Sequence, residues 1–230
     1  MESSYPIRIN KYLNETHGMS RRSADTLIAA GKVLVNGTPA TLGDMVNEDD
    51  EVTLVDHDHS HYVYYAYYKP KGVVTVNAEP GEKEIASIAS FPQEVFPLGR
   101  LDKDSEGLII MTNDGSITRA FTDPDQGIEK EYAVTLNRPL THQALVRLRS
   151  GVRIDIGKKK YTTKKAPIRR TSKTSFDIIL TEGKNRQIRK MCGAVGFQVV
   201  KLKRFRIKNI ELGNMKPGQW RKLKASELGV

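Results

Sequence analysis

The chain has 230 residues, of which 38% are hydrophobic and 28% are charged, a balance typical of a folded, soluble protein. A single cysteine, Cys192, excludes an intrachain disulfide and a zinc site built from cysteines, and it fits a reducing cytoplasm. The sequence shows no secretory signal, and no apolar run approaches the ~20 residues that span a membrane. We therefore expect a cytoplasmic protein without a membrane segment.

The net charge of +10 is distributed unevenly along the chain. Residues 1–56 carry 5 Lys and Arg against 9 Asp and Glu, and residues 57–137 carry 7 against 13. Residues 138–230 carry 25 against 5, a net charge of +20. This concentration of positive charge favours a polyanionic partner, most often a nucleic acid. The alternative is a basic surface that only keeps the protein in solution.

Residues 1–56 are expected to fold as a small module. Apolar residues at helical spacing predict two short helices, with Ser20 as the cap of the second and Gly31 in the left-handed position after it. Asn36 and Gly37 predict a tight turn. The expected elements are a helix around Ile7–Leu13, a helix over 21–30, and strands at Val33–Val35 and Glu51–Val55.

Residues 57–62 read as a polar linker with three histidines between this module and a domain of residues 63–230. Alternating polar residues in a loop form no defined cage, so we expect no metal site there. In the larger domain, Ser116 and Thr141 are predicted to cap helices. Strands are expected at 62–68, 73–76, 108–112, 132–136, 176–180 and 199–207, and helices at 116–121, 141–151 and 188–195. This pattern indicates an α+β domain with a mixed, largely antiparallel sheet flanked by helices and loops.

Asp102 stands out because it lies shortly before the apolar strand that begins at Leu108. A carboxylate beside a hydrophobic core is costly unless a cation pairs with it, and Arg100 is near enough in sequence to do so. An ionised carboxylate held in this way is available as a nucleophile. Asp104 and Glu106 lie close by and could join Asp102 in a metal site or an acid pair, but we expect Asp104 to organise a turn.

The N-terminal module resembles an S4 RNA-binding domain. Three segments carry the resemblance in the expected order, namely Ile7–Leu13, residues 20–25 and Gly31–Gly37. A local basic patch can bind RNA even on a module that is acidic overall. The cations expected to contact RNA lie at the helix starts and at the helix–strand junction: Arg8, Lys11, Arg21, Arg22 and Lys32.

Five further motifs resemble, in order, the RNA pseudouridine synthases of the RsuA/RluB/RluE/RluF type, and most of all the RluF members, which modify 23S ribosomal RNA. The motif Gly99–Leu108 (GRLDKDSEGL) resembles the active-site motif of that family. The remaining motifs lie at the family's expected places: Lys69–Gly72, Thr112–Gly115, Lys130–Val134 and Glu182–Met191. The resemblance covers almost the whole chain, including the S4-like module.

The resemblance implies a reaction that breaks the bond from uracil N1 to ribose C1′, turns the base and joins C5 to C1′, without a second substrate or a cofactor. Asp102 matches the catalytic aspartate, which could act at C1′, at C6 or at the C2′ proton. Arg100 matches the arginine that helps to extrude the base, Tyr132 the tyrosine that stacks on uracil, and Arg189 the cation that pairs with the aspartate. Phosphate contacts are expected from Lys184, Asn185, Arg186 and Lys190.

The expected substrate is 23S ribosomal RNA or a large-subunit precursor, with a transfer RNA as a further possibility, and the protein is expected to act as a monomer. Two other hypotheses stay open from the residues alone. One is a non-catalytic RNA-binding or ribosome-assembly factor, which would not need Asp102. The other is a metal-dependent nuclease that uses Asp102, Asp104 and Glu106.

Overall fold

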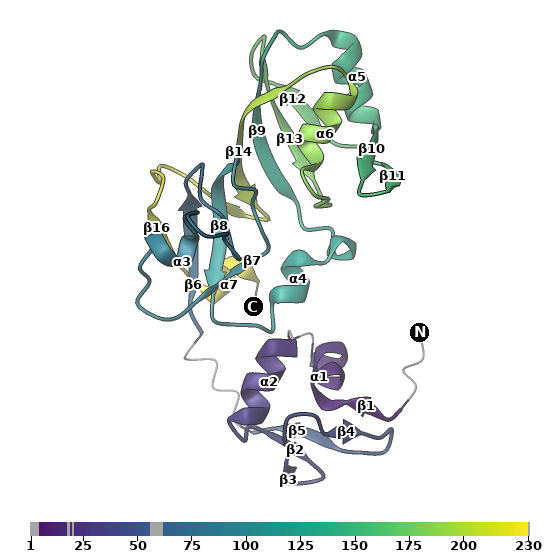
Figure 1. Cartoon of the computed structure of the whole chain (residues 1–230), viewed down its shortest axis with the longest axis vertical. Coiled ribbons are helices and arrows are strands. Elements are labelled where there is room, and N and C mark those ends of the chain that lie inside the picture. Colours follow the sequence, from purple (N-terminus) through teal and green to yellow (C-terminus); the bar gives the residue numbers. More distant parts are fainter. Residues whose placement is uncertain (1–4, 18, 20, 56–61, 230) are drawn as a thin grey trace.

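The computed structural model describes residues 5–17, 19, 21–55 and 62–229 (Figure 1). The predicted Ser20 cap and the predicted linker, apart from Tyr62, lie outside the described residues. Within the described part, no helix is long and apolar enough to cross a membrane.

The N-terminal part has a hydrophobic core of its own. Helices α1 (Ile9–His17) and α2 (Arg21–Ala29) contribute Leu13, Ala24 and Ile28 to it. Five short strands complete this part in two small sheets, one of order β1-β4 and one of order β3-β2-β5. These strands are β1 (Ile7–Arg8), β2 (Val33–Val35), β3 (Thr38–Pro39), β4 (Met45–Val46) and β5 (Val52–Leu54).

Two backbone predictions for this part are confirmed. Gly31 follows α2 with a φ of +68°, and Asn36 and Gly37 both have positive φ in the hairpin between β2 and β3. The first helix starts at Ile9 rather than two residues earlier, because β1 pairs with β4 in front of it.

A nine-stranded sheet organises the rest of the described chain, and it is mixed and largely antiparallel as predicted. Its path is β12-β13-β9-β14-β8-β6-β16, with β15 on β14 and β7 on β8, and only β14 and β8 run parallel. The strands are β6 (Tyr64–Lys69), β7 (Phe96–Leu98), β8 (Glu106–Thr112), β9 (Lys130–Leu136), β12 (Ile168–Arg170), β13 (Ser175–Leu180), β14 (Val199–Ile207), β15 (Ile210–Glu211) and β16 (Trp220–Leu223).

Helices cover the sheet differently in its two halves. Helices α5 (His142–Ser150) and α6 (Gln187–Ala194) lie on the half formed by β12, β13, β9 and β14 and close one large core with it (Figure 1). In the other half β6 is buried on both faces, because its alternate residues enter two different cores. Shorter helices border that half: α3 (Ile85–Ile88), α4 (Thr118–Thr122), a 3₁₀ turn (Pro124–Gln126) and α7 (Ala225–Leu228).

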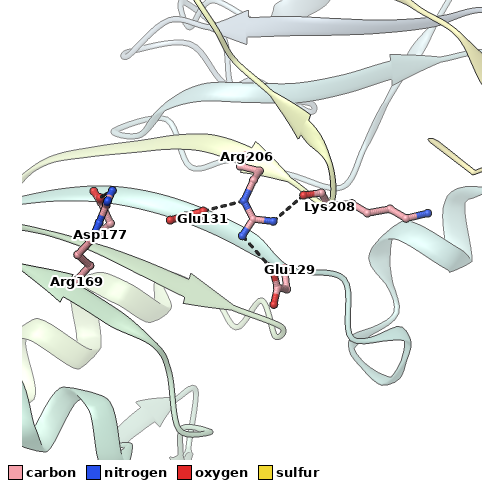
Figure 2. Close-up of polar contacts among 6 residues, drawn as sticks. All are labelled: Glu129, Glu131, Arg169, Asp177, Arg206 and Lys208. Carbon is pink, nitrogen blue, oxygen red and sulfur yellow. Dashed lines mark hydrogen bonds and ion pairs between the residues drawn. The ribbon is translucent and has the colours of Figure 1, made fainter. Parts of the chain in front are cut away.

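The face of β9, β13 and β14 that points away from α5 and α6 carries paired charges (Figure 2). Arg206 donates to Glu131 at 2.7 Å and to Glu129 at 3.0 Å. On the neighbouring strands, Arg169 donates to Asp177 at 2.7 Å. The cations on this face are therefore largely neutralised within the protein.

Three expectations about elements need correction. Residues 73–76 form no strand but a loop with one isolated bridge, Val74 to Glu84. Ser116 does not cap α4, because its hydroxyl and its N–H both donate to the buried Asp114. The sequence analysis also missed a hairpin between α5 and β12, formed by β10 (Arg153–Ile156) and β11 (Lys159–Thr162).

The parallel pair of β8 and β14 meets at Gly107, whose φ is +117°. A Cβ atom at this position would lie 2.1 Å from the Arg204 carbonyl oxygen. Only glycine therefore permits this close approach of two strand backbones.

We expect Gly107→Ala to lower the free energy of unfolding by about 2–4 kcal/mol, because it adds both a backbone clash and φ strain. Urea denaturation with an unchanged m value measures this loss. The matched control is Gly193→Ala, which adds a Cβ into open space on α6 and should cost nothing. Equal stability of the two variants would contradict this account of the strand crossing.

Candidate active site

Asp102 is half-buried in the turn that precedes β8, with the buried Leu101 before it and the exposed Lys103 after it. It lines a cavity of about 500 Å³. The cavity is bordered by the 74–75 loop, the Asp102 turn, β9, β13, β14 and the start of α6. Its lining includes Thr75, Arg100, Leu101, Asp102, Lys103, Ser105, Tyr132, Leu180, Glu182, Lys184, Asn185, Arg186 and Leu202.

The structure therefore brings Asp102, Arg100 and Tyr132 together in one cavity, as the motifs predict. The two predicted arginine pairs of Asp102 are not formed. Among the described residues, the Asp102 carboxylate has no hydrogen-bond or ion-pair partner, and Arg100 is exposed. The carboxylate is held in place through the backbone of its own turn instead.

Thr75 holds the residue directly before Asp102. Its buried hydroxyl donates to the Leu101 carbonyl at 2.6 Å and accepts from the Leu101 N–H at 3.1 Å. A second tie comes from the Gly72 N–H, which donates to the Lys103 carbonyl at 2.8 Å. The Lys103 side chain in turn pairs with Glu82 at 2.6 Å. These contacts fix both sides of Asp102 against the 70s loop.

Arg189 holds the far side of the same turn rather than the carboxylate. Its Nη2 donates to the Asp104 carbonyl oxygen at 3.0 Å, and its Nη1 donates to the Val199 carbonyl. Arg186 pairs with the Asp104 side chain at 3.0 Å, and this contact lowers the pKa of Asp104. The expected pairing of Arg189 with Asp102 is thus replaced by two arginines of the α6 region on Asp104.

Tyr132 forms part of the opposite wall. It lies on β9 between Ile178 of β13 and Arg204 of β14, and the residue is 9% exposed. A nearly buried aromatic in the wall of this cavity can stack on a planar base.

Buried cations behind the cavity are the feature that sequence reasoning missed. Lys69 is fully buried and donates to the carbonyl oxygens of Pro70 and Val73, so it also supports the 70s loop. Burial lowers the pKa of Lys69 to about 8, while the nearby Asp102 charge opposes that change. Arg204 is 4% exposed and donates to the Leu108 carbonyl. Lysine is rarely buried, so no composition or periodicity rule predicts a buried Lys69. The Lys69–Gly72 motif was the one sequence signal that pointed to this residue.

The remaining predicted acids and cations are used in different ways. Glu106 accepts from the Tyr68 hydroxyl and pairs with Lys201 at 3.2 Å. Its partners therefore differ from those of Asp104, which pairs with Arg186. Lys190 donates to Asn185 on the rim of the cavity. In the N-terminal part Lys11 pairs loosely with Glu15, at 3.7 Å. The other predicted RNA contacts of that part are exposed: Arg8, Arg21, Arg22 and Lys32.

Residues 63–194 match the family model of the RNA pseudouridylate synthases, and residues 7–52 match that of the S4 domain. The chain belongs to the RNA pseudouridine synthase family. It is 38% identical over 227 residues to the dual-specificity RNA pseudouridine synthase RluF of Escherichia coli K12, covering 96% of this chain and 77% of the relative.

Two further relatives of this synthase agree with that assignment. The ribosomal large subunit pseudouridine synthase B of Bacillus subtilis is 32% identical over 228 residues, covering 96% of this chain and 93% of the relative. A crystal structure of a pseudouridylate synthase matches with a TM-score of 0.71 at 27% identity, covering 96% and 98% of the two chains. The predicted α+β fold with an N-terminal S4 domain, and the predicted enzyme class, are confirmed.

We expect the Thr75→Val synthase to lose about tenfold or more in its single-turnover rate, because both backbone groups of Leu101 lose their partner and Asp102 is no longer fixed. Thr75→Ser keeps the hydroxyl and should retain most of the rate. Both variants should bind RNA like the parent. A Thr75→Ser enzyme as slow as Thr75→Val would contradict the role of the hydroxyl.

The lowered pKa of Lys69 predicts a pH-dependent stability. The folded protein releases this proton near pH 8, whereas the unfolded chain keeps it until near the ordinary value of 10.5. The unfolded state therefore binds more protons between these values, and stability rises with pH in that window. Relative to Lys69→Met, the parent should gain about 1–3 kcal/mol between pH 8 and 10 in urea denaturation. Parallel pH profiles of the two proteins would contradict the assignment.

Proposed function

We propose that this synthase converts a uridine of large-subunit ribosomal RNA to pseudouridine, with the Asp102 carboxylate as the reacting group. The observation that carries the proposal is the placement of Asp102 in the cavity, held by its backbone and without a side-chain partner among the described residues. The printed names of two relatives, one dual-specific and one acting on the ribosomal large subunit, support the choice of RNA.

The isomerisation is an internal rearrangement of one nucleotide. The N1–C1′ bond breaks, the C5–C1′ bond forms, and the C5 proton is lost as N1 gains one, so no second substrate or cofactor is consumed. A carboxylate in a partly enclosed cavity can act on the sugar or on the base during these steps. Lys69 and Arg204 are buried near this turn, where each donates hydrogen bonds to backbone carbonyls.

The target base must leave its stack to reach this carboxylate. Arg100 is exposed at the cavity, so its side chain can change conformation on binding. Its guanidinium can then take the place of the extruded base in the stack. Tyr132 offers a ring face for the uracil on the opposite wall. Arg189 serves as a positioning residue through the Asp104 carbonyl.

In this proposal, the affinity for RNA comes from polar and cationic side chains at the rim of the cavity and from exposed cations of the S4 domain. Lys184, Asn185, Arg186 and Lys190 border the α6 end of the cavity or lie beside it, where phosphates of the target strand would pass. Arg186 would exchange Asp104 for a phosphate on binding. The S4 domain would add a second, separate contact through its own exposed cations: Arg8, Arg21, Arg22 and Lys32. We infer that the enzyme works as a monomer in the cytoplasm.

Asp102→Asn tests the role of the carboxylate. We expect the variant to lose pseudouridine formation on a 23S ribosomal RNA transcript by about 10⁴-fold or more, because the amide has the same shape but cannot act as a nucleophile or base. Its RNA affinity should stay within about twofold of the parent. Modification is measured by chemical mapping of pseudouridine, with and without EDTA.

Asp125→Asn is the matched control, because it removes the same charge from an exposed carboxylate outside the cavity. Normal modification by Asp102→Asn would refute the proposed chemistry. RNA binding by the parent without modification of any transcript would favour a non-catalytic binding factor. Metal-dependent cleavage that EDTA abolishes would favour the nuclease hypothesis. Modification of 16S or transfer RNA in place of 23S RNA would correct the substrate.

A further inference from the structure

The hairpin of β10 and β11 carries a strong positive charge beside the cavity. Residues 153–165 contain six cations and one acid, Asp155, which gives a net charge of +5. Three of the cations lie together at the turn of the hairpin and are exposed. The cations of the segment are Arg153, Lys158, Lys159, Lys160, Lys164 and Lys165.

This hairpin is joined directly to the cavity wall. The Tyr161 hydroxyl donates to Glu182 at 2.5 Å, and Glu182 lines the cavity. The same buried carboxylate accepts from Gln187 at the start of α6 and from the Lys164 N–H at 3.1 Å. Ile154 of the hairpin is buried in the main core. The hairpin is thus a fixed extension of the wall rather than a loose loop.

The two faces of the hairpin differ in where their lysines lie relative to the cavity. Side chains alternate along a strand, so Lys159 lies on the same face as Tyr161, while Lys160 lies on the other face, opposite Asp155. The Lys184 ammonium lies 5.1 Å from the centre of the Tyr161 ring. Lys184 itself lines the cavity. Cations on the Tyr161 face therefore continue outward from the rim of the cavity.

These lysines are not neutralised within the protein. In the part of the chain that the structure describes, no ion pair involves Lys158, Lys159 or Lys184. Figure 2 shows the opposite situation on the far face of the sheet, where Arg169 and Arg206 are paired with carboxylates. Unpaired cations on one face draw a polyanion to that face.

We propose that Lys159, on the Tyr161 face, and Lys158, exposed in the turn beside it, bind phosphates of the RNA strand next to the target nucleotide, farther out than Lys184 at the rim. The proposal rests on the proposed function, because it takes the cavity as the place where the nucleotide enters. Phosphate contacts fix the register of a strand without reading its sequence. The hairpin would hold the flanking backbone in place while the base is out of its stack, with Tyr161 and Glu182 setting its position.

The test compares two single variants that remove the same charge from adjacent residues, Lys159→Gln and Lys160→Gln. Both are made in the Asp102→Asn background, so that binding is read without turnover. The probe is protein-free 23S ribosomal RNA transcript, titrated over a range of salt concentrations. Lys159→Gln should flatten the slope of log affinity against log salt by about 0.7–0.9, and Lys160→Gln should leave it nearly unchanged.

The double variant Lys158→Gln with Lys159→Gln should flatten the slope by about 1.4–1.8 and lower affinity about tenfold or more near physiological salt. Its charge-matched control is Lys216→Gln with Lys222→Gln, which changes exposed lysines at the β16 end of the sheet. In the parent background, the hairpin variant should raise KM much more than it lowers kcat. Circular dichroism confirms that all variants fold.

Equal effects of Lys159→Gln and Lys160→Gln would overturn the proposal, because they would indicate a general charge effect rather than contacts on one face. A double variant no weaker than its control would overturn it as well. Weaker binding to ribosomal subunits with unchanged binding to bare transcript would assign the hairpin to a ribosomal protein instead. These outcomes concern binding alone, so they are distinct from failure of the catalytic role of Asp102.

Discussion

The close contact between Gly107 of β8 and Arg204 of β14 determines where the active-site groups can lie. This is the one parallel pair in the main sheet of the described chain, and it joins the half built on β6 to the half built on β9 and β13. The Asp102 turn enters β8 from one side of this contact, while Tyr132 lies opposite Arg204 on the other. A wider separation of the strands would move the Asp102 carboxylate away from Tyr132, which holds the base in the proposed function.

Buried cations lie close to this contact, although packing of the core does not require charged residues there. Lys69 and Arg204 are buried near the carboxylate turn, and burial also lowers the pKa of Lys130 to about 8. Burying cations costs free energy, which hydrogen bonds to backbone carbonyls offset only in part. On the far face of the sheet, Arg169 and Arg206 are paired with carboxylates, whereas no ion pair of the described residues involves Lys158 or Lys159 of the hairpin.

Local patterns in the sequence predicted elements well where one rule decided the outcome. Thr141 caps α5 as expected, and β14 has the predicted bounds of Val199–Ile207. Residues 73–76 look like a strand by propensity, but the Thr75 hydroxyl bonds to a loop 26 residues away, which no local pattern reveals. The family motif predicted that Arg189 pairs with Asp102, whereas its actual partners depend on how α6 packs against the Asp102 turn.

The way in which Asp102 is held bears on its chemistry. A carboxylate paired with an arginine would be well oriented, but the pair would have to open before the carboxylate could react with a nucleotide. Here the orientation comes from hydrogen bonds to the backbone at Leu101, Lys103 and Asp104, and Arg189 donates to the Asp104 carbonyl instead of pairing with Asp102. In the proposed function, the carboxylate oxygens are thereby left for the substrate. The backbone atoms of the turn fix the position of Asp102. The side-chain oxygens take no part in these hydrogen bonds, so they can react without breaking them.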